Sequence, residues 1–345
     1  MKKNSILIKN IYYMLSYAFT NLKSEEYKSV QLEEFENVHN LFAAILSKGI
    51  GKQLKRGLYR EYIGKTENLN VIRGKVVIPE AIKNKANHRN TVTCDYDELS
   101  VNNTYNQIIK TTVLLLLRHA KVEENYKNDL RKEMLFFEEV DAVDPKTIHW
   151  SNIRFYRNNI TYQMLIYICQ MIIEGMLLST DKGDYNLASF IDEQRMSRLF
   201  EKFILEYYIA HRPDLNPSAP LIPWAEKEEQ GTKLPIMKSD IVLEKDNRIL
   251  IIDAKYYTRN MQEHFDTYSI VSGNLYQIFT YVKNMSALQP EKEVSGMLLY
   301  AKTDYDIQPD GDYELSGNKI MAKTLDLYQD FSGIANNLDE MAANL

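Results

Sequence analysis

The sequence predicts a two-domain protein of mixed α+β and α/β class. The chain has 345 residues, 45% hydrophobic and 26% charged, which is typical of soluble globular proteins with room for two hydrophobic cores. Helical periodicities alternate with short β-branched runs in both halves. Between the halves, residues 140–159 show little periodicity and contain Pro145. We therefore expect an N-terminal domain over residues 1–150 and a C-terminal domain over residues 151–345.

The first half predicts helices on either side of a strand-rich segment. Ile11, Met14 and Leu15 recur at helical spacing and predict an amphipathic helix packed on its own domain. The other expected elements are helices over 32–54, 106–120 and 121–139, with short extended pieces within 57–99 that Gly64, Gly74 and Pro79 punctuate. His149 and Trp150 follow in the irregular stretch, where we expect them to pack the domain junction.

Positive charge is concentrated between Lys48 and Arg89, where tyrosines interleave with lysines and arginines. A charged run of this kind is most often a solvated face, and the alternative is a surface that binds phosphates or a protein partner. Within it, the sequence Arg73-Gly74-Lys75 predicts a strand bulge or a tight backbone approach.

The second half predicts helices around a β-hairpin. The expected elements are helices over 161–178 and 192–210, the hairpin strands 241–243 and 249–252, a helix that includes 274–282, and strands over 296–300 and 320–325. In the helix at 192–210, apolar residues form a buried face, and Glu201 falls at the edge of that face.

The hairpin is expected to bring two carboxylates together. A two-residue turn at 246–247 sets Lys245 opposite Arg248. Counting outward from that turn places Asp240 opposite Asp253, at the Cβ separation of about 4.5–5.5 Å where like charges are destabilising.

Lys255 is expected to share a face with this carboxylate pair. It lies two residues beyond Asp253, and side chains two residues apart on a strand point the same way. A divalent cation with oxygen ligands would offset the repulsion between the carboxylates. The alternative is structural, because an Asp-x-Lys sequence at a strand end is commonly a solvated edge or a salt bridge.

The same residues resemble a known nuclease superfamily. Asp240, followed after twelve residues by Asp253-Ala254-Lys255, matches the PD-(D/E)xK signature, with Ser239 in the place of its proline. More narrowly, three stretches resemble the McrC family, the nuclease subunits of McrBC modification-dependent restriction systems: KNIYYMLSYAF at 9–19, IIDAKYY at 251–257 and NLYQIFTY at 274–281. The resemblance implies a PD-(D/E)xK nuclease-like C-terminal domain with a central mixed sheet flanked by helices.

The resemblance also implies an active site for DNA phosphodiester hydrolysis. Asp240 and Asp253, with the Ala254 carbonyl, would bind Mg²⁺ or Mn²⁺. Lys255 would orient the attacking water or bind the scissile phosphate. The remaining implied residues are Gln277, which forms an i, i+4 pair with Tyr281 and would position Lys255 or the water, and Glu201, which would be the acidic residue of the preceding helix.

A partner is implied as well. McrC-like subunits pair with an McrB-like AAA+ GTPase ring that binds GTP and recognises double-stranded DNA with modified cytosine. Their non-nuclease half docks on the ring and stimulates GTP hydrolysis. This chain has no nucleotide-binding motif of its own. We therefore expect residues 10–19 and 48–89 to form the docking surface. The candidates for acting at the partner's nucleotide are Arg56, Arg60, Arg73 and Lys75.

Bulk properties narrow the remaining alternatives. The net charge of −5 means that DNA affinity would be local or borrowed from a partner. Cys94 and Cys169 lack metal-ligand spacing, so we expect both to be buried, as fits a reducing cytoplasm. No signal peptide or membrane span is expected. Two other functions stay open: a stand-alone RecB-like DNA nuclease, and a non-catalytic GTPase activator with a relict nuclease domain.

Overall fold

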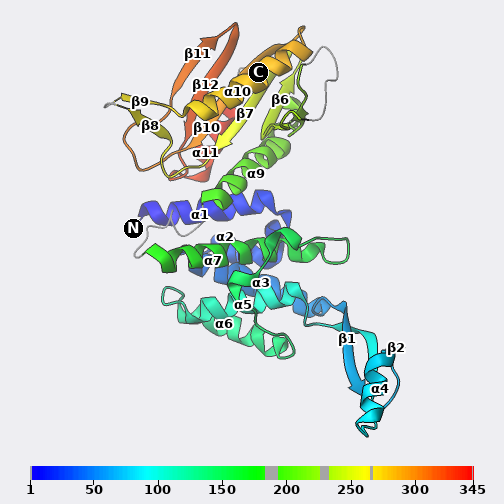
Figure 1. Ribbon diagram of the computed structural model, residues 1–345. Coiled ribbons are helices and arrows are strands. Elements are labelled where there is room, and N and C mark those ends of the chain that lie inside the picture. Colours follow the sequence, from blue (N-terminus) through cyan, green and yellow to red (C-terminus); the bar gives the residue numbers. More distant parts are fainter. Residues whose placement is uncertain (1, 183–192, 226–232, 265–266, 344) are drawn as a thin grey trace. The chain divides into compact units, whose positions relative to one another are not determined.

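The chain divides into two compact units (Figure 1). The computed structural model describes residues 2–182, 193–225, 233–264, 267–343 and 345. Met1–Leu41 and Glu174–Leu345 form the first unit, and Phe42–Ile173 forms the second. The limits fall inside two helices, α3 (Val38–Arg56) and α7 (Gln163–Lys182). Among the described residues, no helix combines the length and apolar character needed to span a bilayer.

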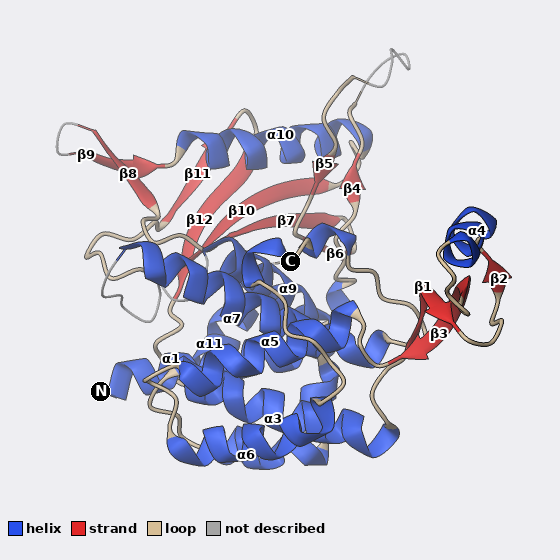
Figure 2. Cartoon of the chain, turned by 60° about the horizontal axis from the view of Figure 1, so that its bottom comes forward, coloured by secondary structure: helices blue, strands red, loops and turns tan. Residues whose placement is uncertain are grey.

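The second unit is helical and carries a small sheet. Besides parts of α3 and α7, its elements are β1 (Glu61–Leu69), β2 (Lys75–Val76), α4 (Ile78–Ala86), β3 (Val92–Ser100), α5 (Thr104–Arg118) and α6 (Glu124–Met134). Strands β1 and β2 both pair antiparallel with β3. Figures 1 and 2 show these strands and α4 standing apart from α5 and α6. We call β1–β3 with α4 the small-sheet module.

The small-sheet module confirms one expectation and corrects another. Gly74 has a φ of +70°, and a Cβ there would lie 2.5 Å from the Asp95 carbonyl oxygen, so the expected tight backbone approach is confirmed. The expected extended piece before Pro79 contains β2 at Lys75–Val76, but it ends earlier than expected, because α4 begins at Ile78. Pro79 stands in the first turn of α4, where a missing N–H loses no helical hydrogen bond.

The observed division differs from the boundary expected near residue 150. The irregular stretch around that position belongs to the second unit and is bound to α5. Tyr105 donates its hydroxyl proton to the Arg154 carbonyl, and the Val143 N–H donates to Thr111 Oγ1 at 2.9 Å. Side-chain hydrogen bonds hold this segment in place of a periodic apolar face, so its low periodicity does not mark a linker.

The first unit contains a mixed five-stranded sheet. Its described elements are α1 (Lys2–Ala18), α2 (Lys28–Leu32), α9 (Glu193–His211), β4 (Leu221–Ile222), β5 (Met237–Lys238), β6 (Ile241–Lys245), β7 (Arg248–Lys255), β8 (Met261–His264), β9 (Thr267–Ile270), α10 (Ser272–Leu288), β10 (Glu293–Ala301), β11 (Gly311–Leu315), β12 (Asn318–Leu325) and α11 (Phe331–Ala342). The sheet order is β11-β12-β10-β7-β6. The three central strands are parallel and both edge strands are antiparallel to their neighbours.

Helices cover both faces of this sheet (Figure 2). On one face, Ile278 and Val282 of α10 pack with Ile249 and Ile251 of β7 in a buried cluster. Helix α9 contacts the residue that follows β7: the ring centroid of Phe200 lies 6.2 Å from that of Tyr256. The cluster sets α10 against β7, the strand that carries the predicted carboxylate and lysine.

Most expected elements are present, with shifted ends. The expected helices at 106–120, 161–178 and 192–210 correspond to α5, α7 and α9, and the strands at 296–300 and 320–325 correspond to β10 and β12. The helix expected over 32–54 corresponds to α3, which begins later, at Val38; residues 33–37 separate it from α2. Cys94 and Cys169 are buried, as expected.

Helix α1 belongs to the sheet-bearing unit rather than to the N-terminal domain in which we expected it. The Tyr17 hydroxyl and His211 Nε2 of α9 form a hydrogen bond at 2.7 Å. The buried Asn10 amide donates to the carbonyls of Leu327 and Gln329, each at 2.8 Å. The apolar face of α1 is thus covered by the C-terminal part of the chain, which corrects the assignment of residues 10–19 to a separate docking half.

Candidate active site

The hairpin has the predicted register. Lys245 faces Arg248 across the turn, and the antiparallel pairing continues without a bulge up to the residue next to Asp240. The next pair in this register is Asp240 and Asp253. Asp246 has a φ of 53°, so the turn uses a left-handed residue, a conformation that Asp tolerates better than most side chains.

Lys255 joins the hairpin to α10. Its Nζ atom lies 2.8 Å from Asp253 Oδ2 and donates to Gln277 Oε1 at 3.1 Å. The Gln277 Nε2 group in turn donates to the Tyr281 hydroxyl at 3.0 Å. Lys255 is thereby held between a strand carboxylate and a helix amide. The i, i+2 spacing puts Asp253 and Lys255 on one face of β7, and the i, i+4 spacing puts Gln277 and Tyr281 on one face of α10. Sequence spacing alone does not show that these two faces meet.

The Asp253 carboxylate is buried beside the Lys255 ammonium. Only 1% of the residue is exposed. Its Oδ2 lies 2.8 Å from Lys255 Nζ, a charge-assisted contact, and no other donor among the described residues is in hydrogen-bonding geometry with either carboxylate oxygen. Asp240 differs, because its Oδ2 accepts the backbone N–H of Ala254 at 3.0 Å.

Burial dominates the electrostatics of the site. It raises the pKa of Asp253 to about 7, where the nearby Asp240 adds to the effect and Lys255 opposes it. Burial also raises the pKa of Asp240. For Lys255, burial is the largest single effect and acts to lower the pKa, but the charge and hydrogen bonding of Asp253, together with the charges of Tyr257 and Asp240, outweigh it and the pKa is raised. The site therefore holds two carboxyl groups whose raised pKa values disfavour ionisation, beside an ammonium group whose raised pKa favours the charged form.

Glu201 lies near this group but is held separately. Burial and the charge of Asp240 raise the pKa of Glu201, while Lys255 acts to lower it, so the carboxyl is within electrostatic range of both. Its Oε1 accepts a hydrogen bond from Ser197 at 2.9 Å on the same helix. Glu201 is the least directly connected of the predicted site residues.

The donor set fits a hard divalent cation. Lys255 is the ion-pair partner of Asp253, and Asp240 lies opposite Asp253 in the hairpin register. The Ala254 N–H points at Asp240, so the Ala254 carbonyl points to that side of the strand as well. Within the described residues, no group of three or more His, Cys, Asp or Glu side chains could hold a metal ion. Mg²⁺ is commonly bound through one or two carboxylates, with water and phosphate as its other ligands, so two carboxylates suffice.

Three polar residues beside Lys255 were not predicted. Asn274 accepts a hydrogen bond from the Tyr257 hydroxyl and donates one to the Tyr300 hydroxyl, both at 3.2 Å. Tyr300 lies next to Lys255 in the β7–β10 register. The available signal was the spacing of Asn274 three residues before Gln277, which places both on one helical face.

The four basic candidates of the second unit are exposed: Arg56, Arg60, Arg73 and Lys75. Arg73 is also anchored, since its guanidinium lies 4.2 Å from the Tyr96 ring centroid and 3.5 Å from the Glu98 carboxylate. These contacts hold Arg73 on the surface of the small-sheet module.

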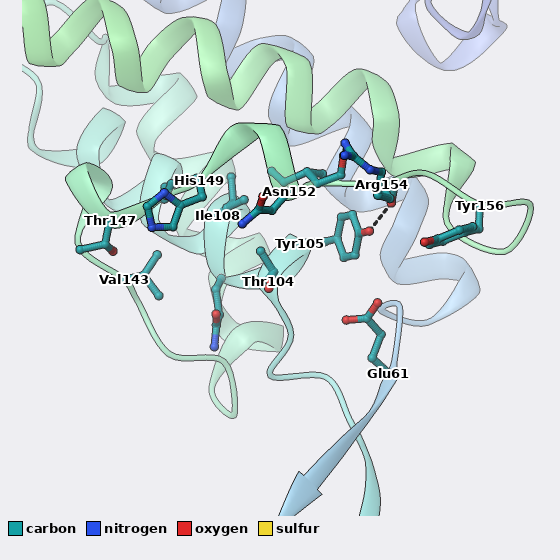
Figure 3. A pocket seen from close by; sticks show the side chains of 13 residues that line it. Glu61, Thr104, Tyr105, Ile108, Val143, Thr147, His149, Asn152, Arg154 and Tyr156 are labelled. Atoms are coloured by element: carbon teal, nitrogen blue, oxygen red, sulfur yellow. Dashed lines mark hydrogen bonds between the residues drawn. The ribbon is translucent and has the colours of Figure 1, made fainter.

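The second unit also contains a cavity of about 470 Å³ (Figure 3). Its lining residues include Tyr105, His149, Asn152, Arg154 and Tyr156. His149 is exposed there, which differs from the expected packing role. Among the described lining residues Glu61 is the single acidic side chain, so this cavity lacks the paired carboxylates of the hairpin site.

Comparisons with known proteins place the chain in a family. The sequence model of the "McrBC 5-methylcytosine restriction system component" family matches residues 3–301. The "Type IV methyl-directed restriction enzyme EcoKMcrBC" of Escherichia coli (strain K12) is 28% identical over 347 residues, covering 98% of this chain and 97% of that protein. A half-complex from a tetradecameric assembly of Thermococcus gammatolerans McrB AAA+ hexamers with bound McrC shares the fold, with a TM-score of 0.53, 19% identity, and coverage of 98% of this chain and 75% of that one. The chain therefore belongs to the family of McrBC 5-methylcytosine restriction system components.

Proposed function

We propose that this chain is the Mg²⁺-dependent endonuclease subunit of a GTP-dependent restriction complex that cleaves double-stranded DNA with modified cytosine. The observation that carries the proposal is the buried Asp253, with Asp240 opposite it and Lys255 beside it, at the end of the hairpin. Family membership supports the restriction role.

The site residues have complementary roles in phosphodiester hydrolysis. Asp240, Asp253 and the Ala254 carbonyl would hold Mg²⁺, which when bound lowers the pKa of a coordinated water and neutralises charge on the phosphate. Lys255, positioned by the Gln277 amide, donates to a phosphate oxygen or to the attacking water. Glu201 would act on the site through the electrostatic interaction between its carboxyl group and that of Asp240.

We further propose that the partner is an AAA+ GTPase ring. The Thermococcus gammatolerans structure contains McrB AAA+ hexamers with bound McrC, and the present sequence has no nucleotide-binding motif. The small-sheet module is the proposed docking surface, because exposed apolar side chains mark protein interfaces. Its large exposed apolar residues are Tyr62, Val71, Ile72, Ile78, Ile82 and Leu99. Arg56, Arg60, Arg73 and Lys75 would then face the ring.

The test reconstitutes the full chain with its GTPase partner and measures DNA cleavage and GTP turnover side by side. Asp253→Ala and Lys255→Ala should abolish cleavage and leave GTPase stimulation intact. The matched controls are Asp312→Ala and Lys319→Ala, an exposed ion pair at 2.9 Å on β11 and β12 of the same sheet, which should cleave normally. Cleavage at the wild-type rate by Asp253→Ala would remove the site assignment.

A second arm tests the docking surface. The double variant Val71→Asp with Ile82→Asp should lose GTPase stimulation in the absence of DNA, because it places charge on the apolar face of the small-sheet module. The full chain is needed, since a fragment ending at residue 150 would separate α1 from α9, which pack together. Normal stimulation by the correctly folded double variant would move docking elsewhere.

A further inference from the structure

A small pocket lies beyond the carboxyl ends of β7 and β10. Its volume is about 170 Å³. This is below the roughly 300–1,000 Å³ of pockets for drug-sized ligands, so it has room for a single planar ring. The lining residues that matter here are Arg259, Asn260, Tyr268, Tyr305, Asp306 and Ile307. We call it the Tyr268–Tyr305 pocket.

The walls of this pocket are exposed aromatic and apolar side chains. Tyr268 is 39% exposed, Tyr305 51% and Ile307 48%. The Arg259 guanidinium lies 5.5 Å from the Tyr305 ring centroid. Tyrosine rings and guanidinium planes are the surfaces on which unpaired nucleobases stack, with little dependence on sequence.

Hydrogen bonds to the Gln308 side chain fix the loop that carries Tyr305. The buried Asn260 amide donates to Gln308 Oε1 at 2.7 Å. The Gln308 side chain also accepts from the Thr303 N–H at 3.2 Å and donates to the Tyr305 carbonyl. The Gln308 side chain thus joins the loop that carries Tyr305 to the segment after β7.

The Tyr268–Tyr305 pocket lies near the candidate active site. Tyr300 pairs with Lys255 in the parallel register, so β7 and β10 end side by side. Arg259 follows Lys255 by four residues, a span of at most about 14 Å. Because a DNA strand rises about 3.4 Å per nucleotide, the pocket is within about four nucleotides of a phosphate bound at Lys255. The β8–β9 hairpin that carries Tyr268 extends beside the sheet (Figure 1).

We propose that the Tyr268–Tyr305 pocket binds one unpaired nucleobase of the DNA strand close to the cleavage site. The base stacks on Tyr305 and Tyr268, and the Asp306 carboxylate accepts a hydrogen bond from an exocyclic amino group. The identification of DNA as the ligand rests on the proposed function. The wall formed by Tyr305, Asp306 and Ile307 lies beyond residues 3–301, the part of the chain that the family model matches.

The test measures DNA binding rather than cleavage. The full chain, titrated to about 10⁻⁴ M, is added to a fluorescein-labelled single strand of about 12 nucleotides and to an abasic strand of the same length. Tyr305→Ala and Tyr268→Ala should each weaken binding of the normal strand by about 5- to 150-fold, the range for loss of one base stack. Tyr305→Phe should bind like wild type, since its ring still stacks. Tyr313→Ala, which removes a tyrosine 41% exposed on β11, is the matched control.

Three results would overturn the proposal: no binding of the normal strand by the wild-type chain, unchanged binding by Tyr305→Ala, or an equal loss with the abasic strand. The thermal midpoint of each variant confirms that it is folded. Failure of the proposed function is separately visible, because it is measured as cleavage in the reconstituted complex, whereas this assay measures only strand binding by the pocket variants. A chain that selects the normal strand over the abasic one but never cleaves DNA would retain the pocket and lose the nuclease assignment.

Discussion

The Lys255 Nζ atom lies 2.8 Å from Asp253 Oδ2, and Asp253 is 1% exposed. One ammonium cannot balance both Asp253 and the facing Asp240 when both are ionised. Excess buried negative charge is costly, so either a proton or a metal ion must make up the difference. Because burial raises the pKa of Asp253 to about 7, a proton would compete with a bound metal ion near neutral pH.

Magnesium should stabilise the protein more at pH 8 than at pH 6. The folded pKa of Asp253 lies above the value of about 3.9 for an unfolded aspartate, so ionisation costs the metal-free protein stability as the pH rises from about 4 through about 7. Magnesium binds the ionised form, and its apparent affinity should fall up to about tenfold per pH unit below pH 7. Thermal unfolding with and without Mg²⁺ measures this. Asp253→Asn is the control and should show no pH-dependent shift, whereas equal shifts at both pH values in the wild type would contradict the prediction.

Gln277 is expected to act by positioning Lys255. Gln277→Ala removes the acceptor at 3.1 Å from Lys255 Nζ and should lower cleavage by about 10- to 100-fold, as is typical for residues that orient a metal site. Tyr281→Phe removes only the hydroxyl that holds Gln277, so its effect should be smaller. The measurement is cleavage rate against pH in the reconstituted complex. A purely structural role would lower the thermal midpoint of Gln277→Ala without this graded order.

The local part of the candidate site could be predicted from the sequence. The Asp240–Asp253 pairing depends on one turn and two short strands, so the register follows from counting outward from residues 246–247. The contact between Lys255 and Gln277 is different, because β7 and α10 meet only through the packing of the first unit. The spacing of Gln277 and Tyr281 predicts that they share a helix face, and only the resemblance to McrC proteins predicted which way that face points.

Long-range association could not be predicted by these patterns. Tyr17 and His211 are 194 residues apart, and nothing in the periodicity of α1 indicates that its apolar face meets α9. The same holds for Asn260 and Gln308, whose hydrogen bond builds the Tyr268–Tyr305 pocket across 48 residues. Polar side chains that hydrogen-bond to distant backbone or amide groups leave no periodic pattern in the sequence. Segments held in this way are therefore predicted as irregular loops.

The packing of α10 on the sheet should be sensitive to one methyl group. A Cβ at Gly296 would lie 2.8 Å from both Ile278 Cγ1 and Val282 Cγ2, so Gly296→Ala forces the helix away from β10. We expect a loss of about 1–3 kcal/mol in the free energy of unfolding, with reduced cleavage because α10 also carries Gln277. Gly273→Ala is the control on the same helix: a Cβ there meets nothing within 4 Å, and alanine favours helix by up to about 1 kcal/mol. Denaturant unfolding of both variants tests the contrast, and equal stabilities would contradict it.

Lengthening the hairpin turn should inactivate the nuclease without unfolding the chain. An inserted glycine between Asp246 and Asn247 leaves the strands able to pair, but a one-residue slip turns the side chain at Asp240 to the opposite face from Asp253. Strand β7 stays in place because it pairs with β10 on its other side, so the slip falls on the edge strand β6. We expect loss of cleavage and of the Mg²⁺-induced thermal shift, with GTPase stimulation retained. The control is Asp246→Gly, which keeps the turn length and suits the observed φ of 53°, so it should remain active. Full cleavage by the insertion variant would show that the two carboxylates do not act as a pair.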